Sequence, residues 1–337
     1  MKKRQSPPSI HTAGVGIIYL VLTLLSVAAV ISALTVGSAD ISLSRVLATF
    51  TGEDRTARVI VVGLRLPRLA GAALAGAALA TAGQLLQSVT DNELCAPNII
   101  GVNSGSGLAV MLVLSLFPMY WQLLPLAAFI GALAASFFVL LVSGASPGDQ
   151  KSSLILAGVA LSSILGAGIS FLSLKYPDVL SSYTAFSVGG FSGVTFDELA
   201  IPAVMIIVCF ILAMIAAPKI NLLCLGDEAA GSLGVRVRRL RVFTIVITSG
   251  LCAAAVSFAG LLGFVGLIVP HIIRRICGQR LRRILPITAL GGALLVVFSD
   301  VIGRTILAPG ELPAGIIMAL IGAPFFLYLL VRRRRHD

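Results

Sequence analysis

The sequence predicts an all-α polytopic membrane protein with about ten transmembrane helices. Of its 337 residues, 58% are apolar and only 12% are charged, and the mean hydropathy is +1.03, whereas soluble domains are about 25% charged. Charge-free runs of twenty or more residues recur along the whole chain, as expected for helices that cross a bilayer. So few charges cannot form a surface in water, which excludes an ordinary soluble protein.

Eight charge-free runs define the expected spans. They are residues 15–34, 69–90, 94–148, 152–174, 199–218, 242–273, 284–299 and 312–331. The first run follows three basic residues and is too long for a typical signal-peptide core, so we expect it to remain as a span. The third run is long enough for two spans, and Pro118 and Pro125 bracket a turn within it.

Charge decides how the run 242–273 is threaded. It is shorter than two full spans, yet the arginines before and after it should share one side of the membrane by the positive-inside rule. We therefore expect the chain to turn back near Gly260, Gly263 and Gly266, with a helix that continues past His271. This gives ten spans with both termini cytoplasmic, and 18 of the 25 Lys and Arg on the cytoplasmic side. The net charge of +11 then needs no nucleic-acid partner.

Catalytic chemistry is not visible in the sequence. It has no P-loop, zinc-protease, serine-hydrolase or dinucleotide-binding motif, so we expect no catalytic residues and no cofactor. We expect no metal site either, because the five cysteines form no C-x-x-C and His271, which we interpret as structural, is the one histidine outside the tails. Asp300 precedes Arg304 by four residues, so the two can pair on one helix.

These absences leave a passive conduit that is powered by another protein. An ion-coupled secondary transporter would place ionisable residues near the bilayer midplane, and a membrane-embedded enzyme or assembly protein would need a polar group of residues within the spans. The candidates are Asp300 and Arg304, which directly follow the run 284–299. Both classes remain as alternatives, and uptake by the purified chain along an ion gradient would favour the first.

The loop between the sixth and seventh spans reads LGDEAAGSLGV. Asp227 is expected to cap a short helix and Gly234 to end it, while Ala229, Ala230 and Leu233 form an apolar stripe. Such a helix fits the groove of a partner, or it is an ordinary surface helix.

One loop on the opposite side is rich in arginine, against the usual bias. It contains Arg45, Arg55, Arg58, Arg65 and Arg68. Arg304 lies on the same side, at the end of the ninth span. These side chains either contact lipid headgroups or dock to an acidic partner.

Seven blocks follow one another along roughly residues 40–330. They read RLPR from Arg65, GAALATAG from Gly76, PNIIGVNSG from Pro97, LGDEAA from Leu225, GFVGLIVPHI from Gly263, ELPAG from Glu311 and GAPFF from Gly322. In this order they resemble the FecCD-type permeases of bacterial ABC importers for iron–siderophore, haem and vitamin B12. The resemblance implies a type II importer permease in the bacterial cytoplasmic (inner) membrane, with residues 1–337 as a single integral membrane domain.

The resemblance also implies partners and site residues. The permease would pair with a second permease subunit, identical or paralogous, and would bind ATPase subunits inside and a substrate-binding protein outside. Residues 220–237 would form the cytoplasmic coupling loop. Its ATPase contacts would be Asp227, Glu228, Ala229, Ala230, Ser232 and Leu233.

Two further sites follow from the same resemblance. Arg65, Arg68 and Arg304 would meet carboxylates on the binding protein, and Asn92 with Leu94 would contribute to the cytoplasmic gate. The family's usual N-P-L-A reads Asn-Glu-Leu-Cys here. Glu93 thus replaces a proline, which we expect to change the stiffness of the loop or the selectivity of the gate.

Overall fold

A computed structural model describes residues 12–37, 42–51, 54–145 and 150–333, and within these ranges it contains helices and no strand. The first half consists of α1 (Thr12–Thr35), α2 (Leu43–Thr51), α3 (Arg55–Arg58), the π-helical η1 (Val59–Arg65), α4 (Leu66–Thr90), the 3-10 segment η2 (Pro97–Ile100), α5 (Val102–Leu116), η3 (Pro118–Leu123), α6 (Leu124–Ala145) and α7 (Gln150–Lys175). The second half consists of η4 (Pro177–Val179), α8 (Leu180–Val188), α9 (Phe196–Leu223), α10 (Asp227–Ser232), α11 (Val237–Ala259), α12 (Val265–Cys277), α13 (Leu281–Ile306) and α14 (Ala314–Arg333). The all-α prediction is confirmed.

A helix occupies the position of each expected span. Within the described ranges, six helices are long and apolar enough to cross a membrane: Arg55–Thr90, Pro118–Gly144, Ser152–Lys175, Phe196–Leu223, Val237–Ala259 and Leu281–Ile306. Three shorter apolar helices are Leu20–Thr35, Val102–Leu116 and Ala314–Leu329. The tenth position belongs to α12, whose 13 residues extend about 20 Å at a rise of about 1.5 Å each. Its crossing stays a prediction, because the bilayer core is about 30 Å thick.

The run 242–273 breaks where the glycines predicted it. α11 ends at Ala259, and Gly260 adopts a φ of 68°, which favours a residue without a side chain. The helix resumes as α12 at Val265 and continues past His271. Gly260 and Gly263 therefore lie in the turn, while Gly266 lies in the first turn of α12.

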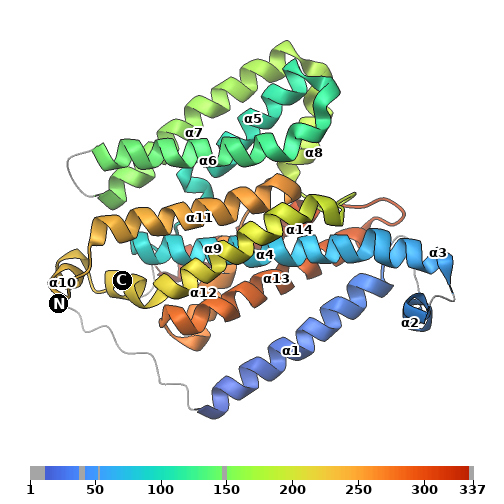
Figure 1. The fold of residues 1–337 in the computed structure, drawn as a ribbon, viewed down its shortest axis with the longest axis horizontal. Helices are drawn as coiled ribbons and strands as arrows, with labels where there is room; N and C mark the ends of the chain where they lie inside the picture. Colours follow the sequence, from blue (N-terminus) through green and yellow to red (C-terminus); the bar gives the residue numbers. More distant parts are fainter. Residues whose placement is uncertain (1–11, 38–41, 52–53, 146–149, 334–337) are drawn as a thin grey trace.

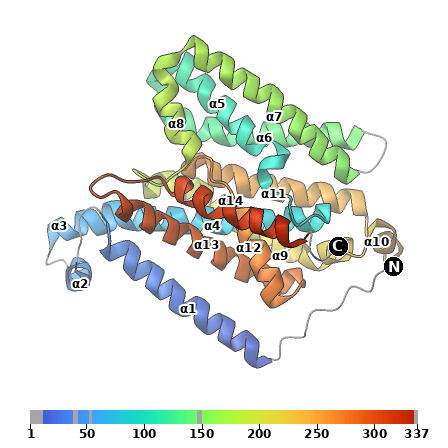
Figure 2. The same ribbon diagram turned by 180° about the vertical axis from the view of Figure 1, so that it is seen from behind.

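Two helices form the centre of the bundle. Within the most apolar 18-residue stretch of each helix, 72% of the residues are buried in α4 and 78% in α11. The corresponding share is 11% in α7 and 22% in α9. Figures 1 and 2 show α5, α6 and α7 as a group beside α11, and α1 along the other side, where it contacts α13. The exposed faces of α7 and α9 are thus left for lipid or for another subunit.

The two ends of the bundle carry different elements. In Figure 1, α10 and the last turns of α14 lie at one end, which we call the α10 end. The helices α2 and α3 and the loop between α13 and α14 lie at the other, the α2 end. The predicted coupling loop and the arginine-rich loop therefore lie at opposite ends.

Small residues let the central helices approach to backbone contact. A Cβ on Gly76 of α4 would collide with the carbonyl oxygen of Gly292 in α13, and a Cβ on Gly83 would collide with Gly266 of α12. Helix pairs in membranes depend on this type of packing. The small residues of α4 thus form a contact face for its neighbours.

We expect Gly76→Ala to destabilise the protein, because the added Cβ must push α4 and α13 apart. Overpacking of this kind costs about 1–3 kcal/mol, measurable as a lower thermal unfolding midpoint in detergent. Gly166→Ala in α7 is the matched control, since nothing lies within 4 Å of its added Cβ. Equal midpoints for the two variants would contradict the close contact.

Candidate docking, coupling and gate sites

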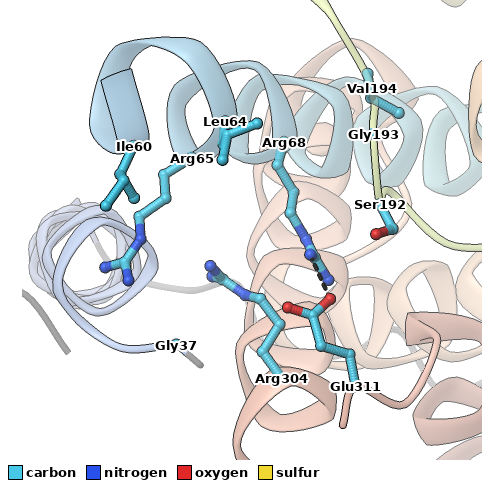
Figure 3. A pocket seen from close by; sticks show the side chains of 10 residues that line it. All are labelled: Gly37, Ile60, Leu64, Arg65, Arg68, Ser192, Gly193, Val194, Arg304 and Glu311. Atoms are coloured by element: carbon cyan, nitrogen blue, oxygen red, sulfur yellow. Dashed lines mark hydrogen bonds and ion pairs between the residues drawn. The ribbon is translucent and has the colours of Figure 1, made fainter. Parts of the chain in front are cut away.

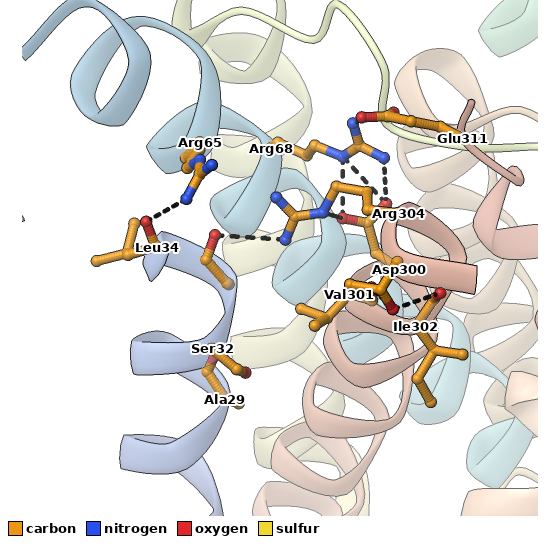
Figure 4. Close-up of polar contacts among 12 residues, drawn as sticks. Ala29, Ser32, Leu34, Arg65, Arg68, Asp300, Val301, Ile302, Arg304 and Glu311 are labelled. Carbon is orange, nitrogen blue, oxygen red and sulfur yellow. Dashed lines mark hydrogen bonds and ion pairs between the residues drawn. The ribbon is translucent and has the colours of Figure 1, made fainter. Parts of the chain in front are cut away.

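At the α2 end, Arg68 is held between two carboxylates (Figure 4). Its Nε and Nη2 donate to Asp300 in α13, at 2.9 Å to Oδ2 and 2.9 Å to Oδ1. Its Nη1 donates to Glu311 Oε2 at 2.7 Å. The fork geometry with Asp300 is the strongest form of arginine–carboxylate pairing, so Arg68 has a fixed orientation.

The predicted pairing of Asp300 with Arg304 is confirmed. Arg304 Nε lies 3.3 Å from Asp300 Oδ2, and its Nη2 donates to the carbonyl oxygen of Ala33 at the end of α1. Arg65 donates to the neighbouring carbonyl of Leu34 at 2.6 Å. Two arginines thus connect the end of α1 to η1, which leads into α4, and to α13. Both of these arginines are buried.

These three arginines line one cavity of about 340 Å³. Figure 3 shows their side chains directed toward a common space from η1, α4 and α13, with Glu311 and Ser192 at its edge. The sequence indicated the three arginines and the pairing of Arg304 with Asp300, but neither of the carboxylates that bind Arg68. Glu311 stood in the ELPAG block without an assigned role, because nothing local places it beside Arg68, 243 residues away in the chain.

Arg45, in the same loop of the sequence, is paired locally. It donates through Nε to Asp54 Oδ2 at 2.9 Å, and Asp54 caps α3 by accepting from the backbone N–H of Ala57. That backbone hydrogen bond, followed by the one from Arg45, lowers the pKa of Asp54. The carboxylate is therefore charged at neutral pH and neutralises Arg45.

At the α10 end, the prediction that Asp227 caps the short helix is wrong. The N-cap of α10 is Gly226, with a φ of 101°, and Asp227 is the first helical residue. The carboxylate of Asp227 accepts two hydrogen bonds from Arg241 of α11 instead, at 2.8 and 2.9 Å. A charged partner from another helix thus takes precedence over local capping, and it fixes α10 onto α11.

The predicted apolar stripe of α10 is also divided. Ala230 is fully buried, while Ala229 is exposed and Leu233 is 60% exposed. Ala229 and Leu233 lie four residues apart and share a face. Gly234, as expected, follows the helix with a positive φ of 80°. One face of α10 therefore packs on the bundle, and the other carries a small apolar surface, Ala229 and Leu233, that the described chain leaves open.

The predicted gate residues lie in a tight loop after α4, also at the α10 end. Asp91 ends the helix in the left-handed conformation, with a φ of 51°. The side chain of Asn92 then accepts from the backbone N–H of Leu94 at 3.0 Å, which is an Asx turn. Asn92 thus shapes the loop, and Leu94 lines a small cavity with Phe325 of α14.

Glu93, in the place of the family's proline, lies beside α12. Its Oε2 is 3.7 Å from His271 Nδ1, and the imidazole meets the ring of Phe325 edge to face. His271 therefore has a structural environment, and the loop gains an electrostatic contact to α12 whenever the imidazole is protonated. Cys95, two residues after Glu93, is buried. Burial raises the pKa of its thiol and keeps the thiol neutral.

A polar network that the sequence analysis missed joins α12 to α4 near this loop. Arg274 donates through Nη2 to Gln87 Oε1 at 2.9 Å, and Gln87 Nε2 donates to the carbonyl oxygen of Gly266 at 3.0 Å. The two glutamines at positions 84 and 87, within the charge-free run 69–90, were the features of the sequence that could have indicated it. Among the residues that the structure describes, no cluster of three or more His, Cys, Asp and Glu could hold a metal ion.

A helical membrane bundle with separate polar attachment points at its two ends has the architecture of a transporter permease. The model of the FecCD transport family matches residues 19–332. A solved inward-facing metal-chelate type ABC transporter superposes with a TM-score of 0.85 and 31% identity, over 94% of this chain and 99% of that one. The chain therefore belongs to the FecCD transport family.

Relatives support the same assignment. The Fe(3+)-citrate import system permease protein YfmE of Bacillus subtilis is 37% identical over 334 residues, which cover 97% of this chain and 96% of that protein. The hemin transport system permease protein HmuU of Yersinia pestis is 36% identical over 283 residues, 82% of this chain and 84% of that protein. The chain is a multi-pass permease subunit of an ABC importer, and ATP hydrolysis lies in partner subunits.

We expect Asp300→Asn to destabilise the fold strongly, because it leaves Arg68 and Arg304 buried without their shared carboxylate. Breaking a buried ion pair on one side typically costs about 3–5 kcal/mol. Thermal unfolding in detergent measures the loss. Asp197→Asn, an exposed site in the first turn of α9, is the control and should cost less than about 1 kcal/mol. An unchanged midpoint for Asp300→Asn would show that the cluster does not support the fold.

Proposed function

We propose that the chain pairs with a second permease subunit, a copy of itself or a close paralogue, and moves an iron–siderophore, haem or cobalamin complex across the cytoplasmic membrane. Residues 1–337 act as one membrane domain. The related permeases that serve Fe(3+)-citrate and hemin support a bulky metal chelate as the cargo. The described part of the chain holds no cluster of metal-binding side chains, which suits a cargo that carries its own metal.

In this proposal the α10 end faces the cytoplasm. Residues 220–237 are the coupling loop, and Asp227, Glu228, Ala229, Ala230, Ser232 and Leu233 form or support the ATPase contact. The observation that carries the proposal is the division of α10, because Arg241 and buried Ala230 fix its inner face while Ala229 and Leu233 remain exposed. A rigidly held helix with a small apolar face is suited to transmit movement from a partner's groove. Both termini then lie in the cytoplasm.

The α2 end faces outward and receives the binding protein. The cavity lined by Arg65, Arg68 and Arg304 is suited to carboxylate side chains, because guanidinium groups bind them in a fixed geometry. Opposite charges also speed association and set the register of two proteins. Asn92 and Leu94 contribute to the gate at the cytoplasmic end.

Reconstitution tests the function as a whole. The chain, with and without the ATPase that co-purifies with it, is placed in proteoliposomes and supplied with binding protein and with radiolabelled siderophores, haem or cobalamin. We expect uptake that requires ATP and the ATPase subunit. Uptake by the chain alone along an ion gradient would instead identify a secondary transporter.

We expect Leu233→Asp to weaken ATPase binding, because it places a charge on the exposed face of α10 without disturbing a buried group. Removal of a central interface side chain costs about 2 kcal/mol or more, which is about a 30-fold loss of affinity. Two assays measure this loss of affinity: co-purification of the ATPase with the permease, and ATP hydrolysis by the complex in proteoliposomes. Met119→Asp, at an apolar residue that is even more exposed than Leu233 and lies near the opposite end, is the control and should leave both unchanged. ATPase activity that survives Leu233→Asp would argue against α10 as the contact.

A further inference from the structure

The two carboxylates that hold Arg68 differ in how firmly they are placed. Asp300 belongs to α13, is 3% exposed, and accepts from both Nε and Nη2. Glu311 belongs to the loop that leads into α14, and its side chain is 30% exposed and contacts only the outer Nη1. Burial and two-point contact make the first pair permanent, while an exposed single contact adds little net stability.

Glu311 also lies at the edge of the cavity that contains the other arginines. Among the described residues, the cavity of about 340 Å³ is lined by the three arginines Arg65, Arg68 and Arg304 and by one carboxylate, Glu311 (Figure 3). Asp300 is buried beneath Arg68 and is absent from that lining. Glu311 is therefore the negative group that an approaching acidic side chain meets first.

We propose that Glu311 is an internal placeholder for a carboxylate of the binding protein. It occupies the outer face of Arg68 in the undocked permease and gives up this face when an acidic side chain of the partner enters the cavity. Asp300 keeps the guanidinium in position during the exchange. Before docking, the same contact limits the attraction of the arginine cavity for other anions. The inference rests on the docking surface proposed above and adds to it a residue that opposes docking.

The charge balance of the cavity supports this exchange. Among the described residues that line the cavity, Glu311 is the one carboxylate. Replacing it with glutamine therefore makes the cavity more positive by one unit of charge. Because electrostatic attraction governs the encounter of charged surfaces and is screened by salt, the identity of residue 311 should set both the affinity and its salt dependence.

The test measures binding of the substrate-binding protein to the complete transporter, permease with ATPase, in nanodiscs at low and at moderate salt. We expect Glu311→Gln to bind about two- to fivefold more tightly than wild type at low salt, the equivalent of releasing one exposed ion pair. Its affinity should also fall more steeply with salt. Glu311→Asp, which keeps the charge, should behave more like wild type than Glu311→Gln does.

Asp197→Asn is the matched control for charge, because it removes one carboxylate from the exposed first turn of α9 at the same end of the molecule. It should shift the affinity less than Glu311→Gln does. An affinity of Glu311→Gln that equals or falls below that of wild type, with an unchanged unfolding midpoint, would overturn the placeholder. The placeholder would also be overturned if the affinity of Glu311→Gln shifted no more than that of Asp197→Asn.

Wild-type binding tests the docking surface separately. If its affinity does not depend on salt, the arginine cavity is not the docking site, and both proposals fail. If wild-type affinity falls with salt while Glu311→Gln behaves like wild type, docking through the arginines stands and only the placeholder is refuted.

Discussion

The close backbone contacts of α4 are the constraint on which the rest of the structure depends. Gly76 lies against Gly292 of α13, and Gly83, two turns further along the same face, lies against Gly266 of α12. Because lipid tails are as apolar as leucine, burial from water cannot hold helices together in a bilayer, and close packing must do so. Neither contact tolerates a Cβ, so α4, α12 and α13 form one tightly packed unit.

This unit also connects the two ends of the molecule. Arg68 lies in the first turn of α4 and reaches Asp300 of α13, while Gln87 lies in its last turn and reaches Arg274 of α12. The proposed docking cluster and the proposed gate loop are therefore attached to the same rigid helix. The group of α5, α6 and α7 contacts this unit largely through α11, so we expect the movements of transport to occur between the two groups rather than within the α4 unit.

The sequence predicted the features that the bilayer determines. It missed most of the side-chain pairs that depend on tertiary contacts. Apolar runs and arginine placement located the spans and the turn at Gly260, because the cost of charge in lipid acts on each segment independently. The pair of Asp300 and Arg304 could be predicted, because residues four apart are neighbours on the surface of a helix. The pair of Arg68 and Asp300 could not be predicted, because the two residues are 232 positions apart in the chain. For the same reason the sequence placed Asp227 as a cap, when Arg241 of another helix binds its carboxylate.

Glu93, in the place of the family's usual proline, replaces a covalent restraint on the loop with a contact between side chains. A proline would restrict the backbone of the loop in every state of the transporter, because its ring is covalent. Here the Asx turn of Asn92 shapes the loop, and Glu93 adds a contact to His271 of α12. That contact exists only while the loop and α12 are adjacent. The stability of the loop is therefore tied to the position of α12, and a gate built in this way is held by the conformation of its neighbour rather than by its own backbone.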